Sequence, residues 1–140
     1  DRAKNKVFAV LGDGELQNGQ VWEAAMAASH YNLNNLIVFV DHNKLQSCEY
    51  VAGVMDTGNV QHKFEAFGWN VVKIVDGHDF DQLLDGVEKA FNSNRRPVML
   101  WCHTVANKGI EFAEGKDIYH RVHLSRGELD AVIPKLKQLV

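Results

Sequence analysis

The stretch Val7-Phe8-Ala9-Val10-Leu11-Gly12-Asp13-Gly14-Glu15 is the most informative part of this chain, because a continuous apolar run ends there in an aspartate between two glycines. A second apolar run, Leu36–Val40, ends in Asp41-His42-Asn43. Asp13 and Asn43 lie thirty positions apart, about the length of a strand–helix–strand unit. Both side chains can therefore meet at the carboxyl edge of one parallel sheet. A carboxylate and an amide oxygen beside a glycine-lined turn suit a hard cation that carries a diphosphate.

The apolar runs predict the fold class. They are short, rich in valine and isoleucine, and continuous rather than alternating, which is typical of strands buried on both faces. Helical patterns separate them. The sequence therefore predicts one α/β domain over residues 1–140, with a mainly parallel sheet between two layers of helices. The four predicted strands are Val7–Leu11, Leu36–Val40, Val71–Val75 and Val98–Trp101.

The segments between the runs carry helix signals. An alanine-rich stretch predicts a helix over Gln20–Tyr31. Lys44–Thr57 is predicted as a loop, followed by a short helix that ends near Gly68. Two later helices begin at predicted capping boxes. These boxes are Asp79 with Gln82, before Leu83, Leu84, Val87 and Phe91, and Ser125 with Glu128, between Leu124 and Leu129 and before Val132, Ile133, Pro134, Leu136 and Leu139.

Composition excludes several function classes. Fifteen basic and eighteen acidic residues give a formal charge of −3, and no basic stripe indicates nucleic acid. No apolar run approaches the roughly twenty residues of a membrane span. Cys48 and Cys102 are too few for a disulfide framework, so we expect a buried, reduced Cys102 and a cytoplasmic protein. The chain begins at Asp1 and enters a strand within six residues, which favours a fragment of a longer polypeptide.

The first turn has the chemistry of a phosphate and metal site. Its glycines allow close approach of phosphate oxygens, and the N–H groups that follow can donate to an anion. Asp13 would bind Mg²⁺, Asn43 would add a neutral oxygen, and the carbonyl of Leu45 could supply a third. The third glycine of a dinucleotide fingerprint is not at its required place.

These motifs resemble a known family. Gly12-Asp13-Gly14-Glu15-Leu16-Gln17-Asn18-Gly19-Gln20-Val21-Trp22-Glu23-Ala24 is similar to the thiamine-diphosphate motif of transketolases, above all the separately encoded N-terminal subunits of bacteria. Asn34-Asn35-Leu36-Ile37, Asp41-His42-Asn43-Lys44-Leu45-Gln46 and His103-Thr104-Val105-Ala106-Asn107-Lys108-Gly109 extend the likeness from about residue 6 to residue 124. The resemblance implies the thiamine-diphosphate-binding fold.

The resemblance also implies roles for individual residues. Asp13 and Asn43 would bind Mg²⁺ through their side chains and Leu45 through its carbonyl. Gly12, Gly14 and the backbone of Glu15 would lie against the cofactor diphosphate. Glu23 matches a glutamate in a carboxylate network at the subunit interface, although an acidic residue early in a helix is favourable in any case. His120 matches a histidine that reaches diphosphate and substrate, with a solvated role as the alternative. His103 is interpreted as structural or supporting.

The implied activity is transfer of a two-carbon ketol unit between sugar phosphates. It requires a pyrimidine-binding partner domain or subunit, in a dimer of such pairs (an α₂β₂ heterotetramer). Another thiamine-dependent transferase, of the deoxyxylulose-phosphate synthase or 2-oxo acid dehydrogenase type, stays open. Asn18 stands where transketolases commonly carry glutamate, and Arg121 where they carry glycine. These departures leave a degenerate, non-catalytic paralogue as a further alternative.

Overall fold

A four-stranded parallel sheet forms the centre of the molecule. The computed structural model describes residues 5–47, 49–93 and 95–137. The strands run in the order β1-β2-β6-β5, and every neighbouring pair is parallel. The order brings β1 (Val7–Gly12) beside β2 (Leu36–His42), and β6 (Val98–His103) between β2 and β5 (Asn70–Ile74). The predicted parallel sheet is confirmed, with Gly12 opposite Asp41 at its carboxyl edge.

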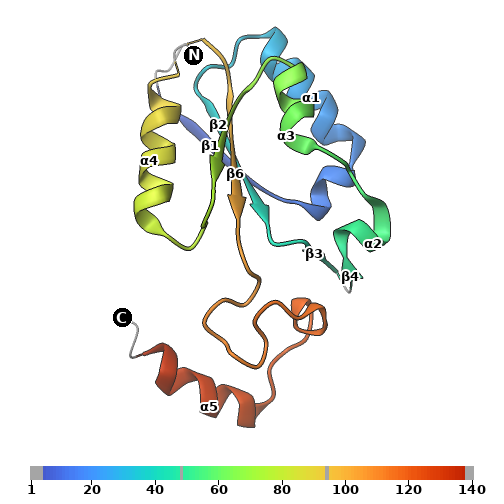
Figure 1. The fold of residues 1–140 in the computed structure, drawn as a ribbon, viewed down its shortest axis with the longest axis vertical. Coiled ribbons are helices and arrows are strands. Elements are labelled where there is room, and N and C mark those ends of the chain that lie inside the picture. Colours follow the sequence, from blue (N-terminus) through green and yellow to red (C-terminus); the bar gives the residue numbers. More distant parts are fainter. Residues whose placement is uncertain (1–4, 48, 94, 138–140) are drawn as a thin grey trace.

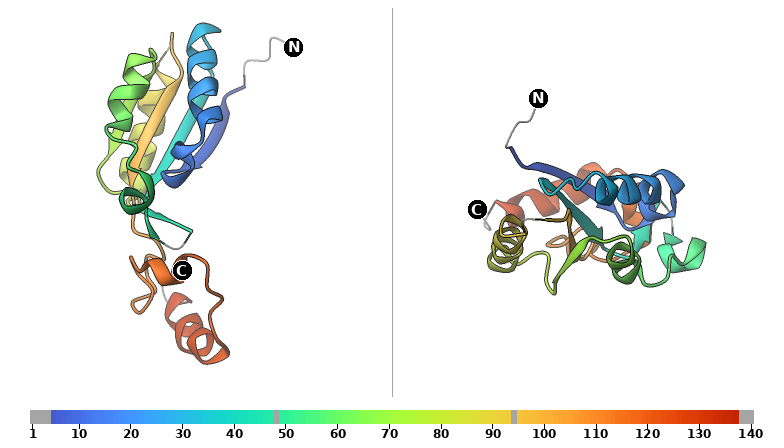
Figure 2. Two further views of the ribbon diagram at one scale, coloured as in Figure 1. Left: turned by 90° about the vertical axis from the view of Figure 1, so that its right-hand side faces the viewer. Right: turned by 90° about the horizontal axis from the view of Figure 1, so that it is seen from above.

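Helices cover the two faces of the sheet (Figure 1). Helices α1 (Gly19–His30) and α3 (Val60–Ala66) lie on one face, and α4 (Phe80–Phe91) lies on the other, as the view from above in Figure 2 also shows. Successive side chains of a strand point to opposite faces of the sheet, so each strand contributes residues to two hydrophobic cores, one on each face. Val38, Val40, Met99 and Trp101 pack with α1 and α3, whereas Ile37, Val98, Leu100 and Cys102 pack with α4. The predicted three-layer α/β arrangement is confirmed.

The prediction that all four strands are buried on both faces is wrong for the two edge strands, β1 and β5, since β5 has a single buried residue. Val10 is 71% exposed and Phe8 is 50% exposed, whereas the residues of β6 from Val98 to Cys102 are buried. β6 is an interior strand, and helices pack against both of its faces. β1 is an edge strand of the described sheet, which α4 reaches through Phe91, whose ring lies 6.2 Å from that of Phe8.

The predicted loop over Lys44–Thr57 contains regular structure. Strands β3 (Leu45–Gln46) and β4 (Glu49–Tyr50) form a small antiparallel hairpin, and α2 (Val51–Met55) follows at once. Lys44 and Ser47 adopt positive φ values of 68° and 39° on either side of β3. Two-residue strands are too short to give a periodic sequence pattern, which is why the sequence indicated only a loop.

The helix starts confirm one predicted capping box and correct the other. Ser125 accepts from the N–H of Glu128, whose carboxylate accepts from the N–H of Ser125, so α5 (Arg126–Leu136) has the complete box. At α4, Asp79 accepts from the N–H groups of Asp81 and Gln82. Gln82 accepts instead from the N–H of Asp76, which ties the preceding loop to the helix. Leu139 lies outside the described residues.

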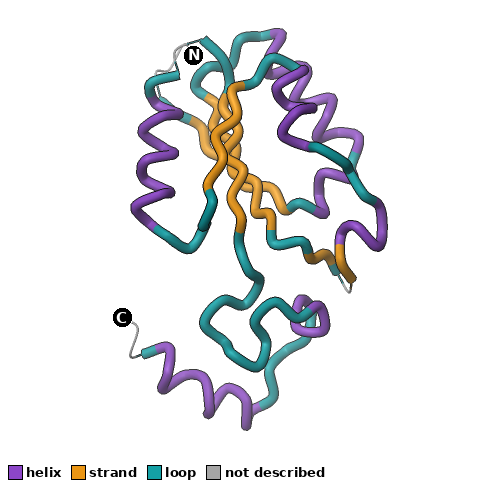
Figure 3. The backbone as a smooth tube through the Cα atoms, in the orientation of Figure 1, coloured by secondary structure: helices purple, strands orange, loops and turns teal. Residues whose placement is uncertain are grey.

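An arm formed by residues 104–137 leaves the carboxyl end of β6 and extends away from the sheet (Figures 1 and 3). It contains a 3-10 turn, η2 (Asp117–His120), and the helix α5. η2 returns to the main body and contacts both strands of the β3–β4 hairpin. Among the described residues, no helix has the length and apolar character needed to cross a membrane.

Candidate functional site

Asp13 is the buried polar residue at the carboxyl edge of the sheet. It follows β1 directly, and its N–H donates to the carbonyl of Asp41 at 3.1 Å. Its side chain is 4% exposed. Oδ2 accepts from the N–H of Lys44 at 2.6 Å and contacts Nδ1 of His42 at 3.1 Å. Oδ1 is buried and has no hydrogen-bond partner within residues 5–47, 49–93 and 95–137.

Asn43 lies between the two residues that hold Asp13. Its Nδ2 donates to Asp41 Oδ2 at 2.9 Å, and its Oδ1 accepts from the N–H of Leu45 at 2.8 Å. Asp41 is held in turn, because the hydroxyl of Thr104 donates to its other carboxylate oxygen. The loop after β2 is therefore fixed against the turn after β1, as the spacing of Asp13 and Asn43 predicts.

The two glycines of the turn have different surroundings. A Cβ added to Gly12 would meet nothing within 4 Å, so its backbone faces open space. Its N–H donates to the Glu15 carboxylate at 3.3 Å. A Cβ on Gly14 would come within 2.7 Å of the Gln46 side chain. At Gly14, the Gln46 side chain occupies the space that a Cβ would fill. At Gly12, that space is open and could accommodate a ligand.

His42 completes the surroundings of Asp13, and it was not among the site residues predicted from the sequence. Its ring lies 4.4 Å from that of Trp101 and 5.1 Å from that of His103, the latter edge-on. Burial, together with the nearby charges of His42, Lys73 and Lys44, lowers the pKa of His103. The place of His42 between Asp41 and Asn43 is the one signal that could have indicated it.

The remaining predicted residues lie at different distances from this centre. Leu45 is buried, at the start of β3. His120 is exposed and ends η2, which contacts the hairpin that Leu45 begins. Glu23 is exposed on α1. In the described part of the chain, no hydrogen bond or ion pair joins Glu23 or His120 to Asp13. The fold therefore brings together the residues that follow β1 and β2, and leaves Glu23 apart from them.

The oxygen atoms at this edge fit a Mg²⁺ ion. Asp13 Oδ1 is a buried carboxylate oxygen without a partner among the described residues, which is costly unless a cation or another donor reaches it. Asn43 and the carbonyl of Leu45 would add neutral oxygens. Mg²⁺ takes oxygen ligands and usually keeps several waters or phosphate oxygens. In the part of the chain that the structure describes, no three His, Cys, Asp or Glu side chains gather as a metal site.

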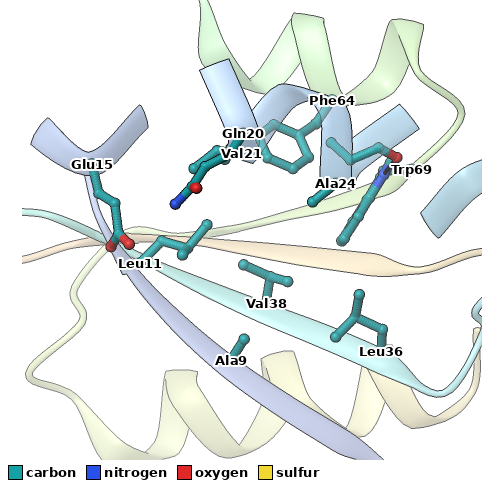
Figure 4. Close-up of a pocket in the computed structure, with 11 residues that line it drawn as sticks. Ala9, Leu11, Glu15, Gln20, Val21, Ala24, Leu36, Val38, Phe64 and Trp69 are labelled. Atoms are coloured by element: carbon teal, nitrogen blue, oxygen red, sulfur yellow. Dashed lines mark hydrogen bonds between the residues drawn. The ribbon is translucent and has the colours of Figure 1, made fainter. Parts of the chain in front are cut away.

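Among the described residues, two cavities include a residue of the turn after β1. One of about 260 Å³ is bounded by Asp13, His42 and Lys44 on one side and by α2 and the segment after it on the other. The other, of about 440 Å³, lies between α1 and the face of β1 and β2 (Figure 4). Its walls are mostly apolar, with Glu15 and Gln20 as its polar members, so it does not suit a diphosphate. The smaller cavity is the one that Asp13 faces.

Comparison with known proteins assigns the chain to a protein family. The family model described as "Transketolase, thiamine diphosphate binding domain" matches residues 1–137. The chain belongs to this family. It is a transketolase-like thiamine-diphosphate-binding domain, as the motif around Asp13 predicts.

Several transketolases and transketolase subunits are similar to the chain. A 6-deoxy-6-sulfo-D-fructose transketolase subunit of Clostridium sp. (strain MSTE9) is 36% identical over 138 residues, which are 99% of this chain and 50% of the relative. An apulose-4-phosphate transketolase subunit of Actinobacillus succinogenes is 34% identical, over 96% of this chain and 48% of the relative. The chain thus spans about half the length of these relatives.

Solved structures confirm the fold. The transketolase of Campylobacter jejuni superposes with a TM-score of 0.85 at 31% identity, covering 97% of this chain and 20% of that one. The transketolase-family fold, with its parallel sheet between helices, is therefore the fold of this chain.

Proposed function

We propose that this chain is the diphosphate- and Mg²⁺-binding part of an enzyme that transfers a two-carbon ketol unit between sugar phosphates. The observation that carries the proposal is the buried Oδ1 of Asp13, unpartnered among the described residues, beside Asn43 at the carboxyl edge of a transketolase-family sheet. Relatives named as transketolases of a sulfo-sugar and of a sugar phosphate support the reaction class.

In this proposal each residue has a distinct task. The side chains of Asp13 and Asn43 and the carbonyl of Leu45 hold Mg²⁺, while Gly12, Gly14 and the backbone of Glu15 lie against the diphosphate. Bound thiamine diphosphate supplies a carbon nucleophile and stabilises the carbanion that results from cleavage. The open space at Gly12 lets an anion approach the backbone closely.

Two predicted residues act farther from the metal. His120 ends a turn at the surface, from which its imidazole can donate to a phosphate or substrate oxygen. Glu23 lies exposed on α1, where a carboxylate is available to a second protomer. We therefore retain His120 as a diphosphate and substrate contact and Glu23 as a member of an interface network.

The proposal includes a partner. Relatives that carry the word subunit in their names, and that are about twice the length of this chain, support a pyrimidine-binding domain or subunit elsewhere. We propose a dimer of such pairs, a heterotetramer that works in the cytoplasm on sugar phosphates.

Calorimetry tests the cofactor site in the intact protein, purified with any partner that accompanies it. Thiamine diphosphate should bind only when Mg²⁺ is present, and Asp13→Ala should abolish that binding. Asp85→Ala removes an exposed carboxylate from α4 and serves as the matched control, with unchanged affinity. Tight binding by Asp13→Ala contradicts the metal assignment.

A second measurement tests the reaction. Ketol transfer from a ketose phosphate to a panel of aldose phosphates is followed by product analysis. Cofactor binding without transfer to any acceptor favours another thiamine-dependent transferase. Failure to bind the cofactor at all favours a degenerate paralogue, to which Asn18 and Arg121 already point.

A further inference from the structure

We propose that His42 is a positioning residue, which orients the carboxylate of Asp13 so that its free oxygen faces the cation. The inference rests on the proposed Mg²⁺ and diphosphate site. Nδ1 of His42 lies 3.1 Å from Oδ2 of Asp13, and the two side chains are 23% and 4% exposed. The contact is therefore a partly buried one between the ends of β1 and β2.

The direction of this hydrogen bond follows from the acceptor. A carboxylate that binds a cation is ionised and can only accept, so His42 must carry its proton on Nδ1. Oδ2 then accepts from two donors, the imidazole of His42 and the N–H of Lys44. Oδ1 accepts from none in the described residues. Rotation of the carboxylate would break both bonds at once, so the pair of donors selects which oxygen stays free.

The fold holds the imidazole itself in place. Asp41 is paired with Cys102 and His42 with His103 in the register of β2 and β6, so the position of the ring is set by the sheet. Trp101 lies against the His42 ring with an interplanar angle of 32°, and His103 meets it edge-on at 73°. Packing on two sides restricts the ring, and a restricted donor keeps the carboxylate in one orientation.

His42 differs in kind from the other donor to Asp13. The N–H of Lys44 belongs to the backbone, so it persists whatever side chain occupies that position. His42 is the side-chain donor and can be removed alone. Mutation of a group that hydrogen-bonds to a metal ligand typically changes the metal affinity by about 10–100-fold. We expect a change of this size in the dissociation constant of Mg²⁺.

Two substitutions separate hydrogen bonding from ring packing. His42→Phe keeps a ring between Trp101 and His103 but removes the donor. His42→Asn replaces the ring with an amide whose nitrogen can take the place of Nδ1. His62→Phe is the matched control, since His62 has an 80% exposed side chain on α3. Mg²⁺ affinity is measured by calorimetry on the intact protein with excess thiamine diphosphate in solution. Thermal unfolding in EDTA checks that each variant is folded.

The proposal predicts weaker Mg²⁺ binding by about 10–100-fold in His42→Phe, largely restored in His42→Asn, with His62→Phe unchanged. If His42→Phe binds Mg²⁺ normally while Asp13→Ala does not, the positioning role is wrong and the metal site stands. If Asp13→Ala also binds normally, the metal site itself fails. If His42→Asn binds Mg²⁺ as weakly as His42→Phe, a donor at this position does not restore the site, and that result overturns the positioning role.

The proposal can also be tested on the unmodified protein, so that the result does not depend on whether a variant folds. Nitrogen-edited NMR of the histidine rings reports which nitrogen of His42 carries the proton. A proton on Nδ1 is expected. A neutral ring protonated on Nε2 alone cannot donate to Asp13, and that result overturns the proposal.

Discussion

The N–H of Lys44 donates to Oδ2 of Asp13 at 2.6 Å, joining residues that are 31 positions apart in the chain. Lys44 has a positive φ of 68°, which turns the chain after Asn43 so that its amide points back at the carboxylate. The same bond occupies one oxygen of Asp13 and leaves the other without a partner in the described residues. A buried carboxylate oxygen without a partner favours cation binding, but it lowers the stability of the fold when no cation is bound.

Asp13→Asn should separate these two properties. The amide oxygen can still accept from Lys44, while a buried negative charge without a full set of partners is removed. In EDTA, the melting temperature should equal or exceed that of the parent protein. Mg²⁺-dependent binding of thiamine diphosphate should be lost. A melting temperature far below the parent value would show that the carboxylate is structural.

Gly12→Ala should leave folding intact and weaken the cofactor. Its φ is negative and an added Cβ meets nothing within 4 Å, so unfolding should be unchanged or shifted slightly toward stability. The new methyl would stand where the diphosphate approaches, and calorimetry should show lower affinity. Unchanged affinity would place the diphosphate elsewhere.

Gly77→Ala is the contrasting substitution. An added Cβ would lie 2.6 Å from Thr104 Cγ2 and 3.0 Å from the His103 carbonyl, which itself accepts from the N–H of Gly77 at 2.7 Å. Because the carbonyl belongs to the central sheet, it cannot easily yield. We expect a loss of about 1–3 kcal/mol in the free energy of unfolding, measured with urea. A loss near zero would mean that the β5–α4 loop yields freely.

The Cys102 thiol gives a pH-dependent prediction. Burial, with a smaller contribution from Asp41, raises its pKa from 9.0 to about 11. A group whose pKa is raised on folding stabilises the fold below its unfolded pKa and loses that contribution as pH rises through the folded value. Stability should therefore fall between pH 9 and about 11. The fall should be smaller in Cys102→Ala, as measured by urea unfolding at each pH.

The capping box of α5 gives a local prediction. Hydrogen bonds from the Ser125 side chain and backbone lower the pKa of Glu128. This stabilisation is present above the unfolded pKa and is lost as pH falls through the folded value. Ser125→Ala should raise the pKa of Glu128 and speed hydrogen exchange in the first turn of α5. Exchange that is unchanged would show that the box does not hold the helix start.

Sequence patterns predicted the parts of the fold that repeat or are locally encoded. Continuous apolar runs located β1, β2 and β6 to within two residues at each end, and the alanine-rich stretch located α1 to within one. The hairpin β3–β4 could not be predicted in this way, because two-residue strands have no period. The exposure of β1 depends on its place at the edge of the sheet, which no local pattern specifies.

That Asp13 and Asn43 follow two strands could be derived from the chain alone, since the residue type, the flanking glycine and the strand signal are all local. The motif around Asp13 that resembles the transketolase family is also a continuous stretch of sequence, so it can be recognised without the structure. Which oxygen of Asp13 is free, and which groups hold the other, depends on the folded molecule. His42 and Lys44 meet that carboxylate because β2 pairs with β1 in one register. A register is a relation between distant segments, so it exists only when the sheet has formed.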